Sequence, residues 1–203
     1  QKPLKWSADL NLAESLFYFL PEDKEFSPQQ ILQQHEKFRL LSAMREGVLG
    51  VNTLNARLFQ EFWRNFEKGR SWALPIIITK NNYQLELYNG MLGVLIGYGG
   101  QTLLQGKAYF SWGENIKELA ACLLPAYELA FCLSVHKSQG SEFDKVILIL
   151  PAGSEIFGKE VLYTAASRAR QSLEIITDQA TLEQALQKNA VKESGLRDCF
   201  IGL

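Results

Sequence analysis

Residues 134–144 read Ser-Val-His-Lys-Ser-Gln-Gly-Ser-Glu-Phe-Asp, and an apolar run, Val146–Leu150, follows almost directly. Open α/β sheets place much of their ligand chemistry in polar, glycine-containing turns next to buried strands, because strand ends and helix starts leave backbone groups free there. We therefore predict that this stretch is a ligand-binding turn that leads into a strand of a parallel sheet.

The rest of the chain mostly alternates between strand and helix patterns. Strands are expected at 38–44, 75–79, 127–133, 146–150 and 173–177, and the β-branched run at 75–79 is typical of a strand buried on both faces. Helices are expected at 11–20, at 29–36 after Ser27-Pro28, at 54–66 with Asn52 as cap, at 159–169, and from Thr181 onward with Asp178 or Thr181 as cap. This alternation predicts an α/β fold in which a parallel sheet carries helices on both faces.

Residues 86–124 follow a different pattern, in which glycines separate short alternating runs. Asn89-Gly90 and the glycines at 93, 97, 99, 100 and 106 interrupt runs at 91–98 and 102–110. Such punctuation is typical of β-hairpins. We therefore expect a small β-barrel or meander at 86–124, inserted into an α/β domain that is formed by 1–85 together with 125–203.

Composition limits the classes of function. A chain of 203 residues with 47% hydrophobic content can bury one good core beside a small second module. The net charge of −1 argues against coating nucleic acid by bulk electrostatics, so any DNA contact must be local. No apolar run approaches the ~20 residues that cross a bilayer, so a cytoplasmic protein without a membrane partner is expected. Cys122, Cys132 and Cys199 lack zinc-ligand spacing, so no metal site is expected.

A second motif, Leu-Tyr-Thr-Ala-Ala-Ser-Arg-Ala-Arg at 162–170, places two arginines at the end of a helical pattern. In this order and separation, the two motifs resemble motifs V and VI of superfamily 1 DNA helicases of the RecD type, the alpha chains of exodeoxyribonuclease V. The resemblance extends from about Phe38 to Leu196. It implies a RecA-like second motor domain with an inserted small SH3-like β-barrel, and an ATP-dependent helicase activity in double-strand break repair and recombination.

The resemblance assigns nucleotide contacts to four residues. Arg168 matches the motif VI arginine, Arg45 matches the motif IV arginine, and Gly140 and Glu142 match the part of motif V beside the nucleotide. Phosphoryl transfer spreads negative charge over the γ-phosphate, which a guanidinium delivered across the cleft stabilises, so Arg168 is the arginine-finger candidate. The residues alone leave other readings open: Arg168 can face a helix dipole, and Arg45 can be a surface turn arginine.

A cluster of small donors on the first motif is suited to holding phosphates and sugars without reading base sequence. These donors are Ser134, His136, Lys137, Ser138 and Gln139. In the family that the chain resembles, this segment contacts single-stranded DNA, and Asn81 lies in the segment that leads into the inserted barrel. A lone histidine is more often structural, and turn chemistry alone explains Asn89-Gly90. Basic residues also outnumber glutamates at 37–70, as in a DNA-binding patch or a solvated helix face.

Residues Gly153–Lys159 have the spacing of a phosphate loop, but Glu160 stands where a hydroxyl would hold Mg²⁺. With bulky Ile156 and Phe157 inside it, the loop is expected to be a plain connection. The resemblance implies that Mg²⁺ and the phosphates of ATP are held by a first motor domain that this chain lacks. The chain is therefore expected to be the C-terminal part of a longer subunit, inactive alone. Its expected partners are that N-terminal motor domain, single-stranded DNA, and RecB-like and RecC-like subunits.

Two other classes of function remain compatible with the sequence. A stand-alone single-stranded DNA-binding or regulatory module would use the turn at 134–139 without any coupling to ATP. A self-contained nucleotide-binding enzyme would instead use Gly153–Lys159. A Walker A domain encoded upstream in the same gene would separate both alternatives from the helicase subunit.

Overall fold

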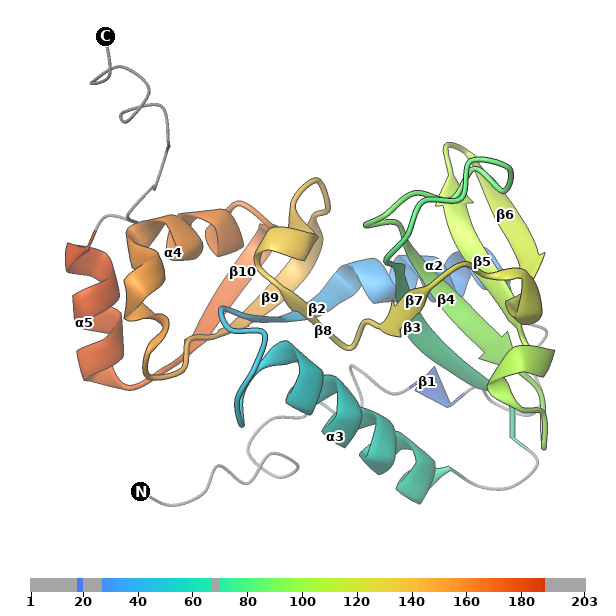
Figure 1. The fold of residues 1–203 in the computed structure, drawn as a ribbon, viewed down its shortest axis with the longest axis horizontal. Helices are drawn as coiled ribbons and strands as arrows, with labels where there is room; N and C mark the ends of the chain where they lie inside the picture. Colours follow the sequence, from blue (N-terminus) through green and yellow to red (C-terminus); the bar gives the residue numbers. More distant parts are fainter. Residues whose placement is uncertain (1–17, 20–26, 67–69, 189–203) are drawn as a thin grey trace, which may run out of the picture.

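Two β-sheets organise the part of the chain that this computed structural model describes, residues 18–19, 27–66 and 70–188. The first sheet has four strands, all parallel, in the order β10-β9-β2-β8. Their bounds are β2 (Phe38–Ser42), β8 (Cys132–Ser134), β9 (Phe143–Ile149) and β10 (Ala169–Ile176). This confirms the parallel sheet expected from the alternating pattern (Figure 1).

The second sheet has six strands, and all of its pairs are antiparallel. Its order is β1-β3-β4-β5-β6, with β7 also pairing with β3. The bounds are β1 (Tyr18–Phe19), β3 (Trp72–Ile78), β4 (Leu92–Gly97), β5 (Lys107–Trp112), β6 (Asn115–Ala120) and β7 (Tyr127–Leu129). Strands β4, β5 and β6 confirm the hairpins expected within 86–124. The structure thus shows an antiparallel sheet there, and the pairing of its described strands does not close into a barrel.

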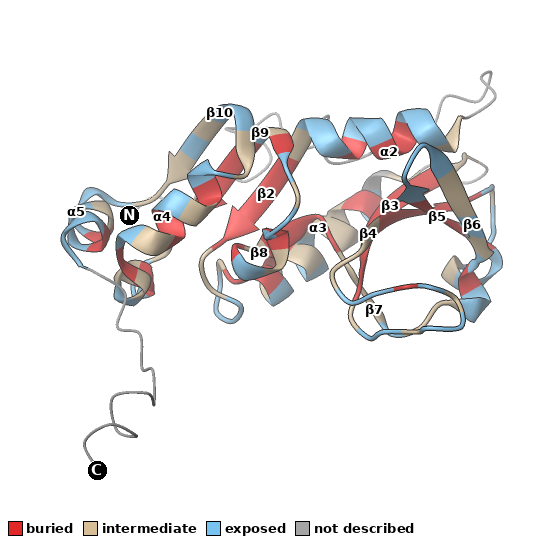
Figure 2. Ribbon diagram, turned by 90° about the horizontal axis from the view of Figure 1, so that it is seen from above, coloured by how far each residue is buried: buried red, intermediate tan, exposed pale blue. Residues whose placement is uncertain are grey.

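Helices cover both faces of the parallel sheet. The described helices are α2 (Pro28–Lys37), α3 (Val51–Asn65), α4 (Gly158–Ala166) and α5 (Gln179–Gln187). In β9, Val146 and Leu148 belong to a hydrophobic cluster with residues of α4 and α5, whereas Ile147 belongs to a cluster with residues of α3. Successive strand side chains point to opposite faces, so the two clusters lie on opposite sides of the sheet. Figure 2 shows how this packing buries β2 along most of its length.

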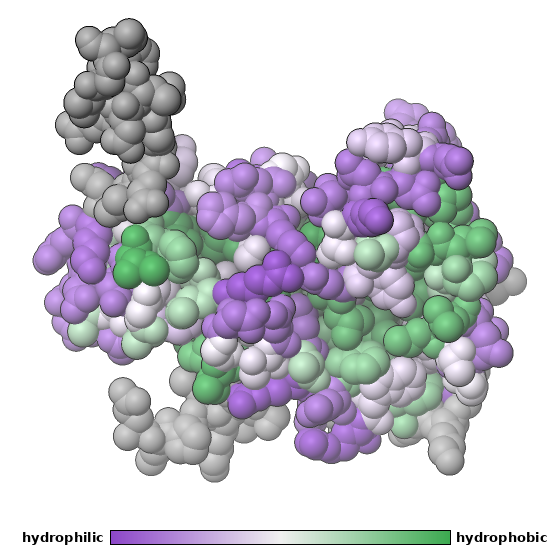
Figure 3. Space-filling view, viewed as in Figure 1, coloured by the Kyte–Doolittle hydropathy of each residue, from purple (hydrophilic) through white to green (hydrophobic). Residues whose placement is uncertain are grey.

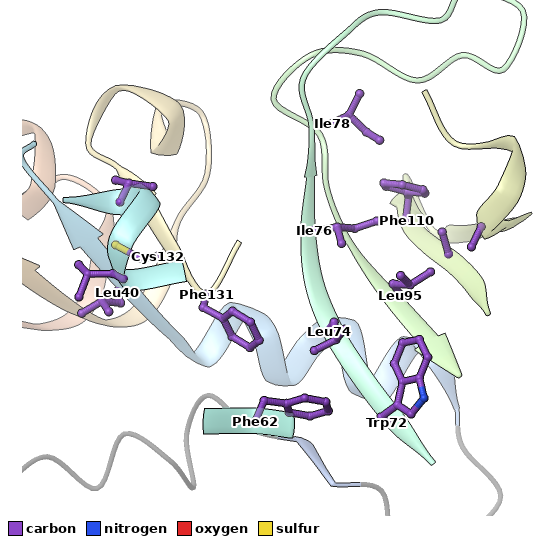
Figure 4. Close-up of a cluster of buried hydrophobic side chains, with 14 of the residues drawn as sticks. Leu40, Phe62, Trp72, Leu74, Ile76, Ile78, Leu95, Phe110, Phe131 and Cys132 are labelled. Atoms are coloured by element: carbon purple, nitrogen blue, oxygen red, sulfur yellow. The ribbon is translucent and has the colours of Figure 1, made fainter. Parts of the chain in front are cut away.

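The larger hydrophobic cluster joins the two sheets. Leu40 and Phe131 from the parallel-sheet side belong to the same cluster as Leu95 and Phe110 from the antiparallel sheet, together with Phe62 of α3. Figure 4 shows Phe131 and Phe62 lying in the space between the sheets. Each of these five side chains is at most 1% exposed. The two sheets therefore share one core.

Two strand expectations need correction. The single strand expected at 127–133 is divided, because β7 joins the antiparallel sheet and β8 joins the parallel one. Ala130 and Phe131 cross between the sheets, and the Ala130 N–H donates to the Pro75 carbonyl at 2.8 Å. The run at 75–79 does contribute to a fully buried strand, β3, but it pairs antiparallel in the second sheet. A continuous apolar run predicts a strand that is buried on both faces, but it does not specify which strand will pair with it.

The helix ends agree only partly with the sequence. Gly50, and not Asn52, is the N-cap of α3, and the Asn52 amide donates to the Glu46 carboxylate instead. A Cβ at Gly50 would collide with the Glu46 backbone carbonyl, so a glycine is needed there. Asp178 caps α5 as expected, because its carboxylate accepts from the Thr181 N–H at 2.9 Å. The helix expected at 11–20 lies outside the described residues, apart from 18–19, which form β1.

Candidate functional site

The turn that joins β8 to β9 is held by its own side chains. It contains a short 3-10 helix, η3 (His136–Ser138). The Ser134 hydroxyl accepts a hydrogen bond from the Lys137 N–H at 3.2 Å, and the Ser138 hydroxyl donates to the Val135 carbonyl at 2.7 Å. These two hydrogen bonds hold the turn in place, and both join residues of the first motif.

Exposure divides the candidate DNA-binding residues of this turn. His136 and Gln139 are exposed. Hydrophilic residues gather over the middle of the face in Figure 3, where Figure 1 places the segment between β8 and β9. Ser138 is fully buried, so its hydroxyl supports the turn and does not face solvent. The Lys137 side chain is 27% exposed and forms an ion pair with Glu128 at 2.9 Å. His136 and Gln139 are therefore accessible at the surface, whereas the Lys137 ammonium is already paired with Glu128.

Glu128 of β7 joins two of the candidate residues. One oxygen of its carboxylate accepts from the Arg45 guanidinium at 3.2 Å, and the other accepts from the Lys137 ammonium at 2.9 Å. These three residues and Ser134 line one narrow pocket, and we call the four of them the carboxyl-edge cluster. Arg45 follows the end of β2 and Ser134 ends β8, so the cluster lies where two parallel strands finish.

The other candidates gather where β9 and β10 begin. Arg168 lies between α4 and β10, and its guanidinium donates to the Ser141 carbonyl at 3.2 Å. Glu142 forms an ion pair with Arg170 at 3.3 Å. A cavity of about 280 Å³ is lined by Gly140, Ser141, Glu142 and Arg170, and α2 and the antiparallel sheet also border it. Arg168 is not among its lining residues. We call Gly140, Ser141, Glu142, Arg168 and Arg170 the amino-edge cluster.

The two clusters lie at opposite ends of the parallel strands. Ser42, the last residue of β2, pairs with Ile149 at the end of β9, whereas Glu142 precedes the first residue of β9. The 7 residues of β9 span roughly 20 Å at ~3.3 Å per residue. Arg45 therefore lies with residues expected to bind DNA, and Arg168 lies with residues expected to bind nucleotide. The nucleotide contact expected of Arg45 stays a prediction that this placement does not favour.

Asn81 belongs to neither cluster. It lies in the loop between β3 and β4, where its side-chain oxygen accepts from the Asn89 N–H at 2.7 Å and its amide donates to the Tyr83 hydroxyl at 3.2 Å. Tyr83 is 74% exposed and packs edge-on against Tyr88. The structure thus gives Asn81 a role in shaping an exposed, aromatic loop. Its expected DNA contact stays a prediction.

The loop at Gly153–Lys159 has the hydrogen bonds of a plain connection. The Gly153 N–H, which a phosphate loop would offer to its ligand, donates instead to the Glu155 carboxylate at 2.7 Å. The Lys159 N–H donates to the Lys188 carbonyl at 3.0 Å. Both N–H groups are thus bonded within the chain, as in a connection between a strand and a helix.

Arg39 is a residue of the site that sequence reasoning missed. It belongs to the basic stretch at 37–70, yet it is only 3% exposed. Its guanidinium donates to the Ala130 carbonyl at 2.6 Å and to the His35 carbonyl at 3.0 Å, and it lies 4.8 Å from the centroid of the Phe143 ring. Arg39 therefore ties α2 to the segment between the sheets and to the start of β9. The available signal was its position within an otherwise apolar strand.

Burial changes the acid–base properties of two groups near Arg39. Burial, and then the charge of Arg39, lowers the pKa of His35 to about 3. Burial raises the pKa of the Cys132 thiol well above its usual range. Both side chains are therefore neutral near pH 7. Within the described ranges, no three His, Cys, Asp or Glu side chains group as metal ligands, and no helix has the length and apolar character to span a membrane.

Comparison with known proteins identifies the family. Residues 129–176, which carry the amino-edge cluster, match the UvrD-like helicase C-terminal domain. The RecBCD enzyme subunit RecD of Haemophilus influenzae is 30% identical over 177 residues, which cover 83% of this chain and 26% of that protein. The corresponding subunit of Mycobacterium tuberculosis strain CDC 1551 is 34% identical over 169 residues, 80% of this chain and 28% of that protein. The chain is a RecD homologue.

This RecD homologue spans about a quarter of the length of the two RecD relatives. Among solved structures, the Pif1 helicase from Bacteroides in complex with ADP-AlF3 and single-stranded DNA matches with a TM-score of 0.45 and 17% identity. That match covers 97% of this chain and 50% of the Pif1 chain.

Proposed function

We propose that this RecD homologue is the C-terminal, RecA-like motor-domain part of an ATP-dependent DNA helicase subunit of the RecBCD type, which acts in double-strand break repair and recombination. The observation that carries the proposal is the contact between the two motifs, in which Arg168 donates to the Ser141 carbonyl at 3.2 Å. The similarity to RecD over 80–83% of the chain supports it and does not favour a stand-alone binding module.

The amino-edge cluster forms the nucleotide side of the proposed function. Gly140 has nothing within 4 Å of the place a Cβ would take, so a phosphate or ribose can approach its backbone closely. Arg168 would stabilise the charge that develops on the γ-phosphate. The Glu142 carboxylate suits a ribose hydroxyl, because its exposed pair with Arg170 holds it only weakly. The other ligands of ATP and of Mg²⁺ would come from the N-terminal motor domain of the same subunit.

The turn after β8 forms the DNA side. His136 and Gln139 are exposed donors, and Lys137 and Ser134 lie beside them in the carboxyl-edge cluster. Such a set holds a single strand by its backbone without reading bases. In this proposal the antiparallel sheet that contains β4, β5 and β6 corresponds to the SH3-like barrel of the family, with 86–124 as the inserted module. RecB-like and RecC-like subunits in the cytoplasm complete the assembly.

Two measurements test the proposal. The chain alone should not hydrolyse ATP, because the Gly153 N–H is already bonded within the chain and the other ligands of ATP and Mg²⁺ would come from the N-terminal motor domain. DNA-stimulated hydrolysis by a clean preparation, abolished by Lys159→Ala, would contradict this.

In the complete subunit, Lys137→Ala should weaken binding to oligo(dT) and to a mixed-sequence strand equally. It should also reduce the slope of log affinity against log salt by ~0.7, one phosphate's worth. Lys145→Ala is a matched control, because Lys145 is a β9 lysine that pairs with Glu174. A loss confined to one base sequence would count against the DNA assignment.

A further inference from the structure

The ion pairs of Glu128 have an unusual distribution. Glu128 sits on β7 of the antiparallel sheet, whereas both of its cationic partners, Arg45 and Lys137, follow strands of the parallel sheet. Each carboxylate oxygen serves one partner, at 3.2 Å for Arg45 and 2.9 Å for Lys137. Two cations thus converge on one anion at the boundary between the sheets.

The chemistry of this arrangement matches a phosphodiester. A phosphodiester carries one negative charge shared by two oxygens, as a carboxylate does, and arginine and lysine are the side chains that most often hold such groups. Ser134 lines the same pocket, and its hydroxyl is a neutral group that can donate a hydrogen bond. The pocket lies on the turn that carries His136 and Gln139, so an anion placed there would lie on the line of the proposed DNA contacts.

Glu128 can be displaced at little cost. Its side chain is 40% exposed, that of Arg45 is 58% exposed, and that of Lys137 is 27% exposed. Solvent screens ion pairs with this much exposure, and they contribute little to stability. A rotation of the Glu128 side chain into solvent would free both cations without moving β7.

We propose that Glu128 occupies, in the DNA-free chain, the site of one backbone phosphate of the single strand, and that Arg45 and Lys137 are the ligands of that phosphate. Arg45 then belongs to the DNA side and not to the nucleotide side. The inference rests on the proposed function, because it requires that a single strand binds along this turn. Glu128 acts as a competing anion: it keeps two cations paired until a strand replaces it, and this weakens unproductive binding of other anions.

The variant Glu128→Gln tests the competition, because glutamine has the same shape without the charge. Binding of fluorescein-labelled oligo(dT) to the complete subunit is followed by anisotropy across a salt series. The affinity for oligo(dT) should rise roughly two- to fivefold, because this factor corresponds to the contribution of an exposed ion pair. The slope of log affinity against log salt should steepen by ~0.7, because one more uncompensated cation meets the strand.

Glu174→Gln is the matched control. Glu174 pairs with Lys145 at 3.3 Å and is 47% exposed, so its replacement changes the net charge equally but away from the pocket. It should leave affinity and slope close to those of the unmodified subunit. If both variants raise affinity equally, the effect is bulk electrostatics and the inference is wrong.

Arg45→Gln separates the two assignments of Arg45. Added to Glu128→Gln, the Arg45→Gln change should cancel the gain in affinity for oligo(dT) and the steeper slope of log affinity against log salt. It should leave the binding of a fluorescent ATP analogue unchanged. If Arg45→Gln weakens binding of the analogue and leaves oligo(dT) binding intact, Arg45 is a nucleotide ligand and the inference fails while the proposed function stands. If no form of the subunit binds oligo(dT), the proposed DNA function itself fails, and the inference fails with it.

Discussion

At the scale of single residues, the two arginines of the second motif differ in their partners. Arg168 donates to the Ser141 carbonyl and to the Ser167 hydroxyl, at 3.2 and 3.1 Å, and neither partner is charged. Arg170 pairs with the carboxylates of Glu142 and Asp144, at 3.3 and 3.7 Å. The guanidinium of Arg168 is therefore positioned by neutral groups, which leave its charge available for a phosphate. This difference in partners favours Arg168 over Arg170 as the candidate for the arginine finger.

We expect Arg168→Ala to lower kcat for ATP hydrolysis in the complete subunit by roughly 10³-fold or more, with ATP binding retained, because a finger acts mainly on the transition state. Steady-state kinetics gives kcat, and titration with a fluorescent ATP analogue gives the affinity. Arg170→Ala, two residues further along the chain in β10, is the matched control and should have a much smaller effect on kcat. Turnover of Arg168→Ala within a fewfold of the unmodified subunit would rule out the finger role.

At the scale of elements, α2 carries a buried histidine next to the buried Arg39. His35 is 8% exposed, and burial followed by the charge of Arg39 lowers its pKa to about 3. An unfolded chain binds a proton at histidine below a pKa of ~6.5, whereas the folded chain leaves His35 neutral until about pH 3. The contribution of His35 to stability is therefore fully present above pH ~6.5 and is lost as the pH falls toward 3.

The pH dependence of unfolding tests this packing. Between pH 6 and pH 4, the proton on the unfolded His35 should lower the free energy of unfolding by about 1.4 kcal/mol for each pH unit. Urea unfolding at several pH values measures this slope, and His35→Gln should remove that part of it. An NMR signal of His35 that titrates near pH 6.5 in the folded protein would show that the histidine is not buried as described.

At the scale of the whole molecule, the shared core makes the two sheets depend on each other. Phe131 crosses between them and belongs to one cluster with Leu40 of β2 and Phe110 of β5. The antiparallel sheet also extends on both sides of 86–124, through β3 and β7. The boundaries of the inserted module thus stay a prediction, while the core packing favours joint unfolding of both sheets.

We expect Phe131→Ala to lower the free energy of unfolding by about 3–5 kcal/mol, because it leaves a cavity in the core that joins the sheets. Both sheets should still unfold in one transition. Tryptophan fluorescence, to which Trp72 and Trp112 of the antiparallel sheet contribute along with Trp6 and Trp63, should coincide with far-ultraviolet circular dichroism during urea unfolding. Leu123→Ala, at a side chain that is 56% exposed, should change stability by less than about 0.5 kcal/mol. Two separate transitions would show that the antiparallel sheet is an independent unit.

The sequence by itself determined the features that depend on neighbouring residues. The turn at 134–140, the buried run within β9, Asp178 as one of two candidate caps of α5, and a β-hairpin segment whose runs overlap β4 and β5 were predicted from spacing and turn chemistry. The turn and the cap form through bonds between residues three positions apart, such as Ser138 to Val135, and each hairpin pairs strands that are neighbours in the chain. Local patterns therefore suffice to predict them, and the two motifs together also led to the RecD family.

The tertiary structure alone decided which distant segments lie together. It assigned β3 and β7 to the antiparallel sheet, buried Arg39 beneath Phe143, and brought Arg45 to Glu128 across 83 positions of the chain. An apolar strand offers the same backbone hydrogen-bonding groups to any neighbouring strand. The identity of a charged residue does not specify which oppositely charged residue it will pair with. Strand partners and ion pairs are set by how the whole core packs, and that packing put Arg45 and Arg168 at opposite ends of the same sheet.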